Sequence, residues 1–165
     1  MTRKLFACLM FALLLIPAAR ATQAAPRTTN ITMSPLAGRI VELVNGHRRV
    51  AGLPPVTVNP TLMVEAQRFS AVQAGLGRLS HRGNDGTTAG QRFTRAGYNW
   101  RYYGENLAAG QTTAERVVAA WMTSPTHRAV MLHAQMTEIG IGHTWRASDP
   151  SRYMNYYTLE VARPR

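Results

Sequence analysis

The chain has 165 residues, enough for one domain with its own hydrophobic core. Its 19 lysines and arginines outnumber its 8 acidic residues, which gives a formal net charge of +11. The single cysteine excludes an internal disulfide. No motif for sequence-specific nucleic-acid recognition accompanies the positive charge.

The N-terminus has the composition of a secretory signal peptide. Arg3 and Lys4 precede a continuous apolar run, Leu5 to Ile16, which is too short to span a bilayer. Pro17 ends the run, and Ala19-Arg20-Ala21 fits the small-x-small pattern of a cleavage site. Residues 1–21 are therefore predicted to be a signal peptide, with Ala24 or Ala25 as nearby cleavage positions and an uncleaved anchor as the alternative.

Cleavage after Ala21 changes the composition of the chain. It leaves 144 of the 165 residues and no cysteine, and the loss of three cations lowers the formal charge from +11 to +8. Lys4 is the only lysine, so every positive side chain that remains is an arginine, which suits anionic surfaces. We expect a secreted or periplasmic protein with no transmembrane segment in the mature chain, a flexible leader over residues 22–34 and a domain over 35–165.

Two helices are predicted in the first half of this domain. Ser34-Pro35 supplies an N-cap and a first-turn proline, and Gly52 ends the pattern that follows. Asn59-Pro60 repeats the start signal, and this second helix is predicted to end near Gly75 or Gly77. The apolar positions at helical spacing are Leu36, Ile40, Leu43, Val44 and Val50 in the first helix, and Leu62, Met63, Ala66 and Phe69 in the second.

The middle of the chain alternates between polar and apolar segments. Residues 78–90 are predicted to form a loop, a short helix is predicted over roughly 88–96, and Trp100 to Ala109 is predicted to be a strand. Thr112-Thr113-Ala114-Glu115 has the pattern of a capping box that opens a helix through Trp121. Ser124-Pro125 is predicted to open another helix that runs to about residue 133.

The C-terminal segment is predicted to form an antiparallel hairpin. Apolar and polar residues alternate from Glu138 to Trp145 and again from Tyr153 to Val161, with a turn at Asp149-Pro150-Ser151. Helices come first and strands last, without an alternating β-α-β order. This pattern favours an α+β fold with an antiparallel sheet flanked by helices.

Three short segments carry the candidate site: Ser80-His81-Arg82, Gly104-Glu105-Asn106-Leu107 and Trp121 to Arg128. Together they supply His81, Glu105 and His127. Two neutral imidazoles and one carboxylate can hold a divalent metal or transfer protons. Covalent catalysis is disfavoured, because no cysteine remains and neither Ser80 nor Ser124 sits in a nucleophile motif.

Plainer interpretations exist for each of these residues. His81 alone could be a solvated loop histidine, and Glu105 a hydrogen-bond anchor. Asn106 is predicted to satisfy backbone groups, and Trp121 to lie in the core. His47 and His133 are expected to be surface or packing residues on helices, and His143 a satisfied sheet histidine. Glu138 and Glu160 are expected to be sheet-face carboxylates paired with arginines.

The chain resembles the CAP superfamily of cysteine-rich secretory, antigen 5 and pathogenesis-related 1 proteins, in its short bacterial, cysteine-free form. The likeness runs from about residue 36 to 163. It rests on an ordered set of motifs rather than on any one: Asn45 to Arg48, Gly52-Leu53-Pro54-Pro55, Asn59, Leu62, Ala66, His81, Gly97-Tyr98, Gly104 to Ala108, Trp121, Ser124 to Arg128 and Ile139 to Gly142.

The resemblance implies an α-β-α sandwich, with a central antiparallel sheet between helical layers. It also implies a cleft lined by two histidines and up to two glutamates. Carried over by motif, these are His81, His127 and Glu105. The second glutamate of the pattern follows the helix tryptophan, where this chain has Met122-Thr123-Ser124 and no acid. Any mechanism that needs a carboxylate pair is therefore in doubt.

Physical chemistry supports parts of this assignment. Ser124-Pro125 places His127 in the first helical turn, where the helix dipole disfavours the imidazolium. A neutral imidazole is what a metal requires, and zinc or another divalent ion fits such ligands. Glu105 could be a further ligand, a base, or a partner that orients an imidazole.

The sequence leaves open whether the domain is an enzyme. The first hypothesis is a binding module whose cleft holds a metal and a small or extended ligand, which could be a small molecule, a lipid or an envelope component. The sterol-binding loop of some relatives is not recognisable. The second is a metal-assisted, peptidase-like hydrolase, with His81 and His127 as ligands and Glu105 as base or orienter. A third contribution is attraction of the arginine-rich surface to anionic polymers or lipid head groups.

Overall fold

The computed structural model describes residues 33–165, so the predicted signal peptide and nearly all of the predicted leader lie outside the described residues. The elements in chain order are α1 (Pro35–Val50), β1 (Thr57–Val58), α2 (Pro60–Leu76), α3 (Ala89–Arg95), β2 (Trp100–Ala109), α4 (Ala114–Thr123), α5 (Pro125–Met131), β3 (Glu138–Trp145) and β4 (Asn155–Pro164). No helix within residues 33–165 is long and apolar enough to cross a membrane.

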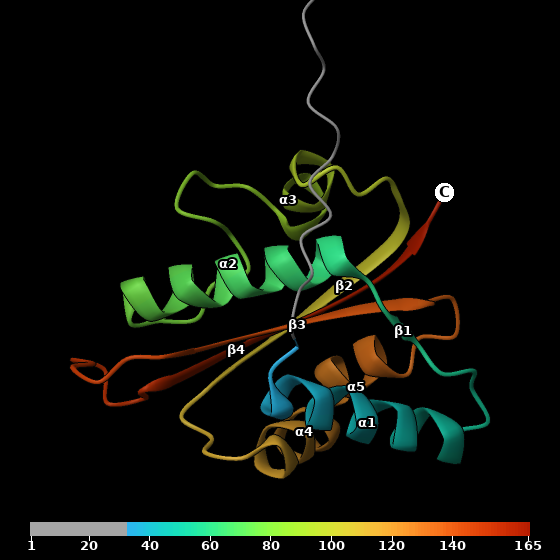
Figure 1. Cartoon of the computed structure of the whole chain (residues 1–165), viewed down its shortest axis with the longest axis horizontal. Coiled ribbons are helices and arrows are strands. Elements are labelled where there is room, and N and C mark those ends of the chain that lie inside the picture. Colours follow the sequence, from blue (N-terminus) through green and yellow to red (C-terminus); the bar gives the residue numbers. More distant parts are fainter. Residues whose placement is uncertain (1–32) are drawn as a thin grey trace, which may run out of the picture. The chain divides into compact units, whose positions relative to one another are not determined.

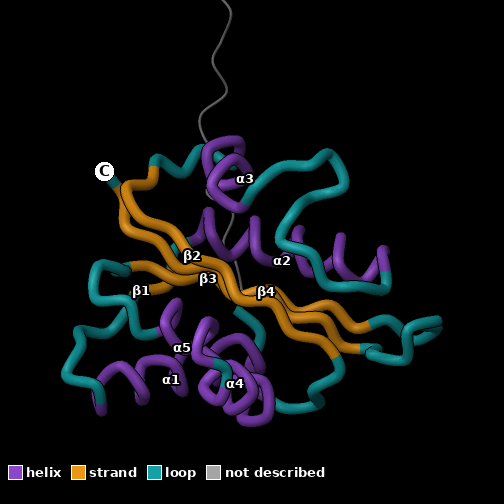
Figure 2. Tube along the Cα trace, turned by 180° about the vertical axis from the view of Figure 1, so that it is seen from behind, coloured by secondary structure: helices purple, strands orange, loops and turns teal. Residues whose placement is uncertain are grey.

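These elements form three layers. The sheet lies in the middle, with α2 and α3 over one face and α1, α4 and α5 over the other (Figure 1). Figure 2 shows the same strands from behind, between the two groups of helices. The predicted α-β-α sandwich is thus confirmed. Below, the face under α2 and α3 is called the upper face, and the face against α1, α4 and α5 the lower face.

The sheet has the strand order β1-β3-β4-β2. The three long strands are antiparallel, as predicted, with Glu105 opposite Glu160 between β2 and β4 and Gly140 opposite Glu160 between β3 and β4. The short strand β1 adds a parallel pairing to β3, which matches Thr57 with Glu138. Its two residues are too few for an alternating pattern, so no periodicity marks them as a strand.

The helix starts follow the predicted capping chemistry with one correction. Ser34 Oγ accepts from the backbone N–H of Ala37 at 3.2 Å, and Asn59 Oδ1 accepts from the first turn of α2. The predicted capping box at the start of α4 is wrong by one residue, because Thr113 is the N-cap and its side chain accepts from the N–H of Arg116. A complete capping box occurs instead in α3, between Thr88 and Gln91.

The main hydrophobic core lies against the lower face. Alternate residues of β3 and β4 point into it and meet α1, α4 and α5. Its fully or nearly fully buried members include Ile40, Val44, Val117, Trp121, Met131, Ile139, Ile141, Leu159 and Val161. Trp121 is therefore a core residue, as predicted, and its indole Nε1 donates to the carbonyl of Leu107 at 3.1 Å.

Two glycines on the upper face let α2 approach the sheet. A Cβ at Gly140 would fall 2.3 Å from the carbonyl carbon of Leu62, and one at Gly142 would fall 2.0 Å from the carbonyl oxygen of Ala66. These distances are far below van der Waals contact, so only glycine fits at either position. The alternation of isoleucine and glycine in β3 thus encodes a core on one side and close backbone packing on the other.

Candidate functional site

The candidate site lies at β2, the edge strand that pairs with β4. Successive side chains of a strand point to opposite faces, and here Glu105 points to the upper face and Asn106 to the lower. Each contacts a segment that carries a predicted histidine. Glu105 binds His81, from the loop before α3, and Asn106 Nδ2 donates to the backbone carbonyl of His127 in α5 at 2.8 Å.

His81 and Glu105 form a direct hydrogen bond. The Nδ1 of His81 lies 2.8 Å from Oε1 of Glu105, and the carboxylate is 3% exposed while the imidazole is 61% exposed. The hydrogen bond to Glu105 is the largest of the effects that raise the pKa of His81. Because Nδ1–H faces the carboxylate, Nε2 is left with its lone pair for a metal, a proton or a ligand.

Arg92 of α3 organises this pair. Its Nη2 donates to the second oxygen of Glu105, and its Nη1 lies 3.3 Å from the backbone carbonyls of His81 and Thr87. The guanidinium carbon stands 3.4 Å from the centroid of the Phe69 ring, which covers its face. One buried arginine thus fixes both the carboxylate and the loop that carries the imidazole.

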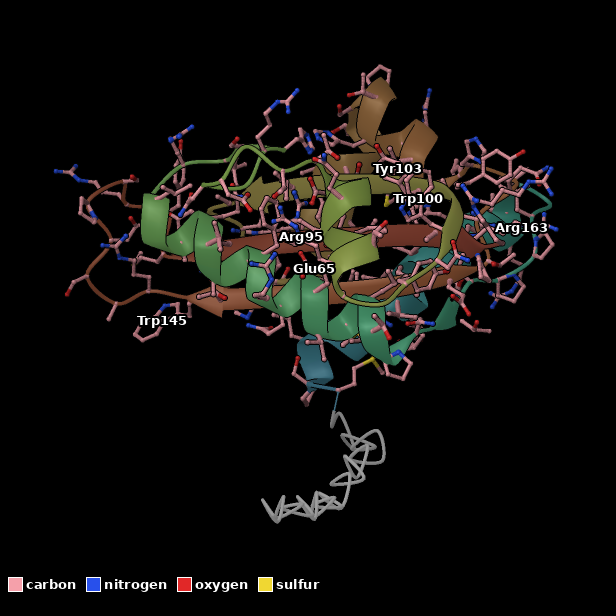
Figure 3. The ribbon with its side chains drawn as sticks, turned by 90° about the horizontal axis from the view of Figure 1, so that it is seen from above. Glu65, Arg95, Trp100, Tyr103, Trp145 and Arg163 are labelled. Carbon is pink, nitrogen blue, oxygen red and sulfur yellow. The ribbon has the colours of Figure 1, made fainter. Side chains whose placement is uncertain are left out.

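The network continues into α2. Arg92 Nε lies 3.1 Å from Oε1 of Glu65, and Arg68 binds both oxygens of Glu65 at 2.7 and 2.8 Å. Figure 3 looks onto α2 and α3 and shows Glu65 and Arg95 near the meeting of the two helices, with Trp100 and Tyr103 beside α3. The upper layer is therefore joined to the sheet by ion pairs rather than by apolar packing alone.

Glu160 is the second carboxyl of this face. It is fully buried, it lies opposite Glu105 in the strand register, and neither of its oxygens has a hydrogen-bond partner within residues 33–165. Burial raises the pKa of Glu160 well above its usual value, and the neighbouring charge of Glu105 adds to the effect. Burial and the neighbouring carboxylate thus both favour the neutral form of Glu160.

The pKa of His127 is shifted in the opposite direction to that of His81. Loss of solvation on burial lowers its pKa, and the charge of His81 lowers it further. The predicted direction is confirmed, although the largest cause is burial rather than the helix dipole. Ser124 is the N-cap of α5 but makes no side-chain capping bond.

The structure brings two of the three predicted residues into contact. His81 and Glu105 touch, whereas His127 is linked to β2 by its backbone carbonyl, which accepts from Asn106 next to Glu105. No group of three or more His, Cys, Asp or Glu residues within the described part of the chain is arranged to hold a metal ion. A metal at this place would have two protein ligands, with Glu105 already engaged by His81 and Arg92.

The serines beside the histidines bond elsewhere. Ser80 Oγ donates to the carbonyl of Arg82 at 3.0 Å, and Ser124 Oγ lies 3.2 Å from Thr126 Oγ1. Within residues 33–165 neither hydroxyl bonds a histidine.

A hollow of about 260 Å³ is lined by neither His81 nor His127. It is found between the start of α1, α2 and β3, and its lining includes Ser34, Met63, Gln67 and His143. His143 stacks on Tyr157 with ring centroids 4.7 Å apart, and its Nε2 bonds Asn155 Oδ1 at 2.9 Å. The prediction of a satisfied sheet histidine is confirmed.

Sequence reasoning missed Glu65 and Arg92 and misassigned two other glutamates. Glu138 accepts from Asn59 and from the hydroxyl of Tyr98, and Glu160 has no bond to an arginine, so the predicted arginine pairing is wrong for both. One signal was available: Glu65 lies three residues after Leu62 and so shares the buried stripe of α2. Its partner Arg92 could not be predicted in this way, because that contact depends on where α3 packs against α2.

Comparison with known proteins agrees with this architecture. The family model described as "CAP: Cysteine-rich secretory protein family" matches residues 41–160. Uncharacterized protein YkwD of Bacillus subtilis (strain 168) is 31% identical over 131 residues, which cover 76% of this chain and 51% of that protein. The chain thus spans about half the length of this curated relative.

Solved structures show the same fold. An outer surface protein from Borrelia burgdorferi superposes with a TM-score of 0.69 at 20% identity, over 76% of this chain and 90% of that one. An extracellular protein containing a SCP domain from Bacillus anthracis str. Ames gives 0.69 at 23% identity, over 80% and 44%. The three-layer sandwich is thus the fold shared with these proteins. The chain belongs to the cysteine-rich secretory protein (CAP) family.

Proposed function

We propose that this chain is an exported binding domain whose two histidines, His81 and His127, hold a divalent metal ion such as zinc. Two imidazoles leave several coordination positions for water or for a ligand. The observation that carries the proposal is the hydrogen bond of His81 Nδ1 to Glu105, which fixes the tautomer that offers Nε2 to a metal. Glu105 is then the orienting residue.

Export is the second part of the proposal. The apolar run of residues 5–16 supports it, as do the names of two proteins of the same fold, an outer surface protein and an extracellular protein. N-terminal sequencing of the protein recovered from the culture medium or the periplasm would test it. A chain that begins near Thr22 is expected; one that retains Met1 in the cytoplasm would contradict it.

Calorimetric titration with zinc tests the metal site. The wild-type protein is expected to bind one ion near pH 7.5, and His81→Ala and His127→Ala should each weaken binding at least about tenfold. His47→Ala, on α1, is the matched control and should bind as the wild type does. The affinity should fall as the pH drops through the raised pKa of His81, because protonation competes with the metal. Equal binding by all variants would disprove the site.

A hydrolytic activity is the second candidate function. It is favoured by the chain of contacts from Arg92 through Glu105 to His81, which resembles an oriented general base. Without a metal on Nε2, His81 would take a proton from an attacking water through the lone pair of that nitrogen. A screen of peptide and ester substrates should show activity that falls at least about a hundredfold in His81→Ala. Activity that survives this substitution at full rate would arise elsewhere.

A further inference from the structure

One edge of the sheet is left open beside the two histidines. Strand β2 pairs only with β4 within residues 33–165, so every second residue of β2 directs its backbone N–H and C=O away from the sheet. The direction follows from Leu107, whose carbonyl accepts from Trp121 and therefore points outward. Tyr103 and Glu105 have the same parity and also point outward.

The hydrogen bonds of the neighbouring strand β4 lead to the same assignment of inward and outward residues on β2. Ala162 of β4 accepts from the N–H of Thr137, on the β3 side, whereas Asn155 accepts from Gly110, on the β2 side. Odd-numbered residues of β4 therefore face β2. Their register partners on β2, such as Gly104 opposite Val161, are the ones that bond inward. The outward assignment of Tyr103 and Glu105 does not rest on a single contact.

The other edge of the sheet is closed. Beyond the short β1, the outer N–H of Ile141 donates to Met63 Sδ at 3.2 Å. Gln67 covers His143 twice, accepting from its N–H at 3.1 Å and donating to its C=O at 3.0 Å. Side chains of α2 thus take the place of a neighbouring strand.

No group within residues 33–165 does the same for Tyr103 and Glu105, whose outward backbone groups we call the open edge. Tyr103 is 38% exposed. Two residues at this spacing present donors and acceptors in the pattern that a further strand would match. An uncovered row of this kind is otherwise an aggregation hazard, and proteins usually block it.

The open edge lies between the two segments that carry the histidines. On the upper side Glu105 holds His81, and on the lower side Asn106 holds the backbone of His127. A strand paired with Tyr103 and Glu105 would therefore run between the His81 loop and α5.

The surrounding charge is positive. Arg82, Arg101 and Arg128 are exposed and adjoin these segments, and within the described residues none of them pairs with a carboxylate. The exposed carboxylates elsewhere are already engaged: Glu42 and Glu115 by Arg39, and Asp85 by Arg95.

We propose that the ligand of this site is an extended acidic peptide, which adds to β2 as a fifth strand through the backbone of Tyr103 and Glu105. The inference rests on the proposed function for the position of the ligand, because it names the ligand class of that same site. The hydrogen bonds between the peptide backbone and β2 need no metal. Peptide carboxylates would complement the three arginines and add a salt-dependent attraction.

The probe is a capped synthetic peptide of alternating glutamate and valine, titrated into the protein in the presence of a chelator. Binding is expected, with amide chemical-shift changes at Tyr103, Glu105 and Leu107. Two further peptides carry N-methyl groups, one on every glutamate and the other on every valine. One of the two should lose binding at least about tenfold and the other should retain it, because only alternate N–H groups face β2. No binding, or equal binding by all three peptides, would overturn the proposal.

Variants of the protein give an independent test. Tyr103→Pro removes an outward N–H and places a ring in the path of the added strand, and proline is tolerated on an edge. Tyr103→Ala loses the same aromatic ring but keeps the N–H. Peptide affinity should fall at least about tenfold further in Tyr103→Pro than in Tyr103→Ala. Equal affinities would overturn the proposal; if the proline variant fails to fold, the N-methylated peptides decide.

The two proposals can fail separately. His81→Ala should lose zinc and keep most of its peptide affinity, since the strand contacts are to the backbone of β2. If zinc does not bind but the peptide does, the open edge stands and the metal site falls. If zinc binds but no peptide does, the reverse holds.

Discussion

Glu105 and Glu160 stand directly opposite each other on β2 and β4, and their side chains share the upper face of the sheet. Glu105 is held by His81 and Arg92, whereas both oxygens of Glu160 lack a partner within the described residues. Burial, together with the repulsion between two like charges at adjacent positions, raises the pKa of Glu160 well above its usual value and favours its neutral form. The site therefore holds a carboxyl pair, built from β4 rather than from the segment after Trp121.

Glu160→Gln should make the stability less dependent on pH. The pKa of Glu160 is raised in the folded state, so its contribution is fully present below the unfolded value near 4.5 and is lost as the pH rises through the folded value. The amide cannot ionise, so the variant should gain at least about 1 kcal/mol over the wild type between pH 5 and pH 8. Urea unfolding at the two pH values measures this, with the exposed Glu42→Gln as control. An unchanged difference would mean that Glu160 is ionised or solvated.

Glu105→Gln should lower the pKa of His81. The hydrogen bond from the carboxylate is the largest cause of the raised value, and a neutral amide cannot stabilise the imidazolium in the same way. A proton NMR titration of the imidazole measures the change, and the exposed Glu115→Gln should leave it unaltered. The variant should also lose roughly 3 kcal/mol of unfolding free energy, because Arg92 loses its partner on β2. An unchanged His81 titration would contradict the hydrogen bond.

Gly142→Ala should disrupt the packing of α2. Its added Cβ would fall 2.0 Å from the carbonyl oxygen of Ala66, so the helix must move. A loss of about 3 kcal/mol or more in unfolding free energy is expected. Gly46→Ala is the matched control, because nothing lies within 4 Å of its added Cβ in α1 and alanine favours a helix by roughly 1 kcal/mol. Equal effects of the two substitutions would disprove the close approach of α2.

Arg48→Met should be among the most damaging substitutions in the lower layer. The guanidinium of Arg48 is fully buried and donates to the backbone carbonyls of Pro54, Met131, His133 and Met136. Methionine leaves these acceptors unsatisfied, at a cost of roughly 3–5 kcal/mol.

Two further variants show whether the loss comes from these bonds. Arg48→Lys should recover only part of the stability, because one ammonium group cannot reach four carbonyls in the same directions. Arg49→Ala, at the exposed neighbouring position, should stay within about 0.5 kcal/mol of the wild type. Thermal unfolding measures all three, and a stable Arg48→Met would contradict the role given to Arg48.

Local signals were sufficient for most of the fold. The caps at Ser34 and Asn59 and the alternation in β3 and β4 predicted elements that the structure contains. These features depend on neighbours in sequence, which is why they could be read from it. The α4 cap lies at Thr113, one residue from the predicted position, because two adjacent threonines offer equivalent capping side chains. Local signals therefore locate a helix start only to within about one residue.

The site could be predicted only in part. His81, Glu105 and His127 were found by motif, but their roles depend on Arg92, Glu65 and Glu160. Those three come from α3, α2 and β4, and no periodicity relates them. Burial of Glu160 also depends on α2 covering the upper face, which follows from the glycines of β3 only once the register is known.

The two faces of the sheet differ in how firmly their helices are packed, which affects the part of the domain expected to open first. The lower face carries the main apolar core, whereas α3 and the His81 loop are attached to the upper face largely through Arg92 and a small apolar cluster around Phe93. Opening that attachment exposes little apolar surface, so its free-energy cost is a fraction of that of global unfolding. We therefore expect the part of the domain that presents His81, which Gln73 also holds through the backbone of Ser80, to open before the three long strands and α1, α4 and α5 do.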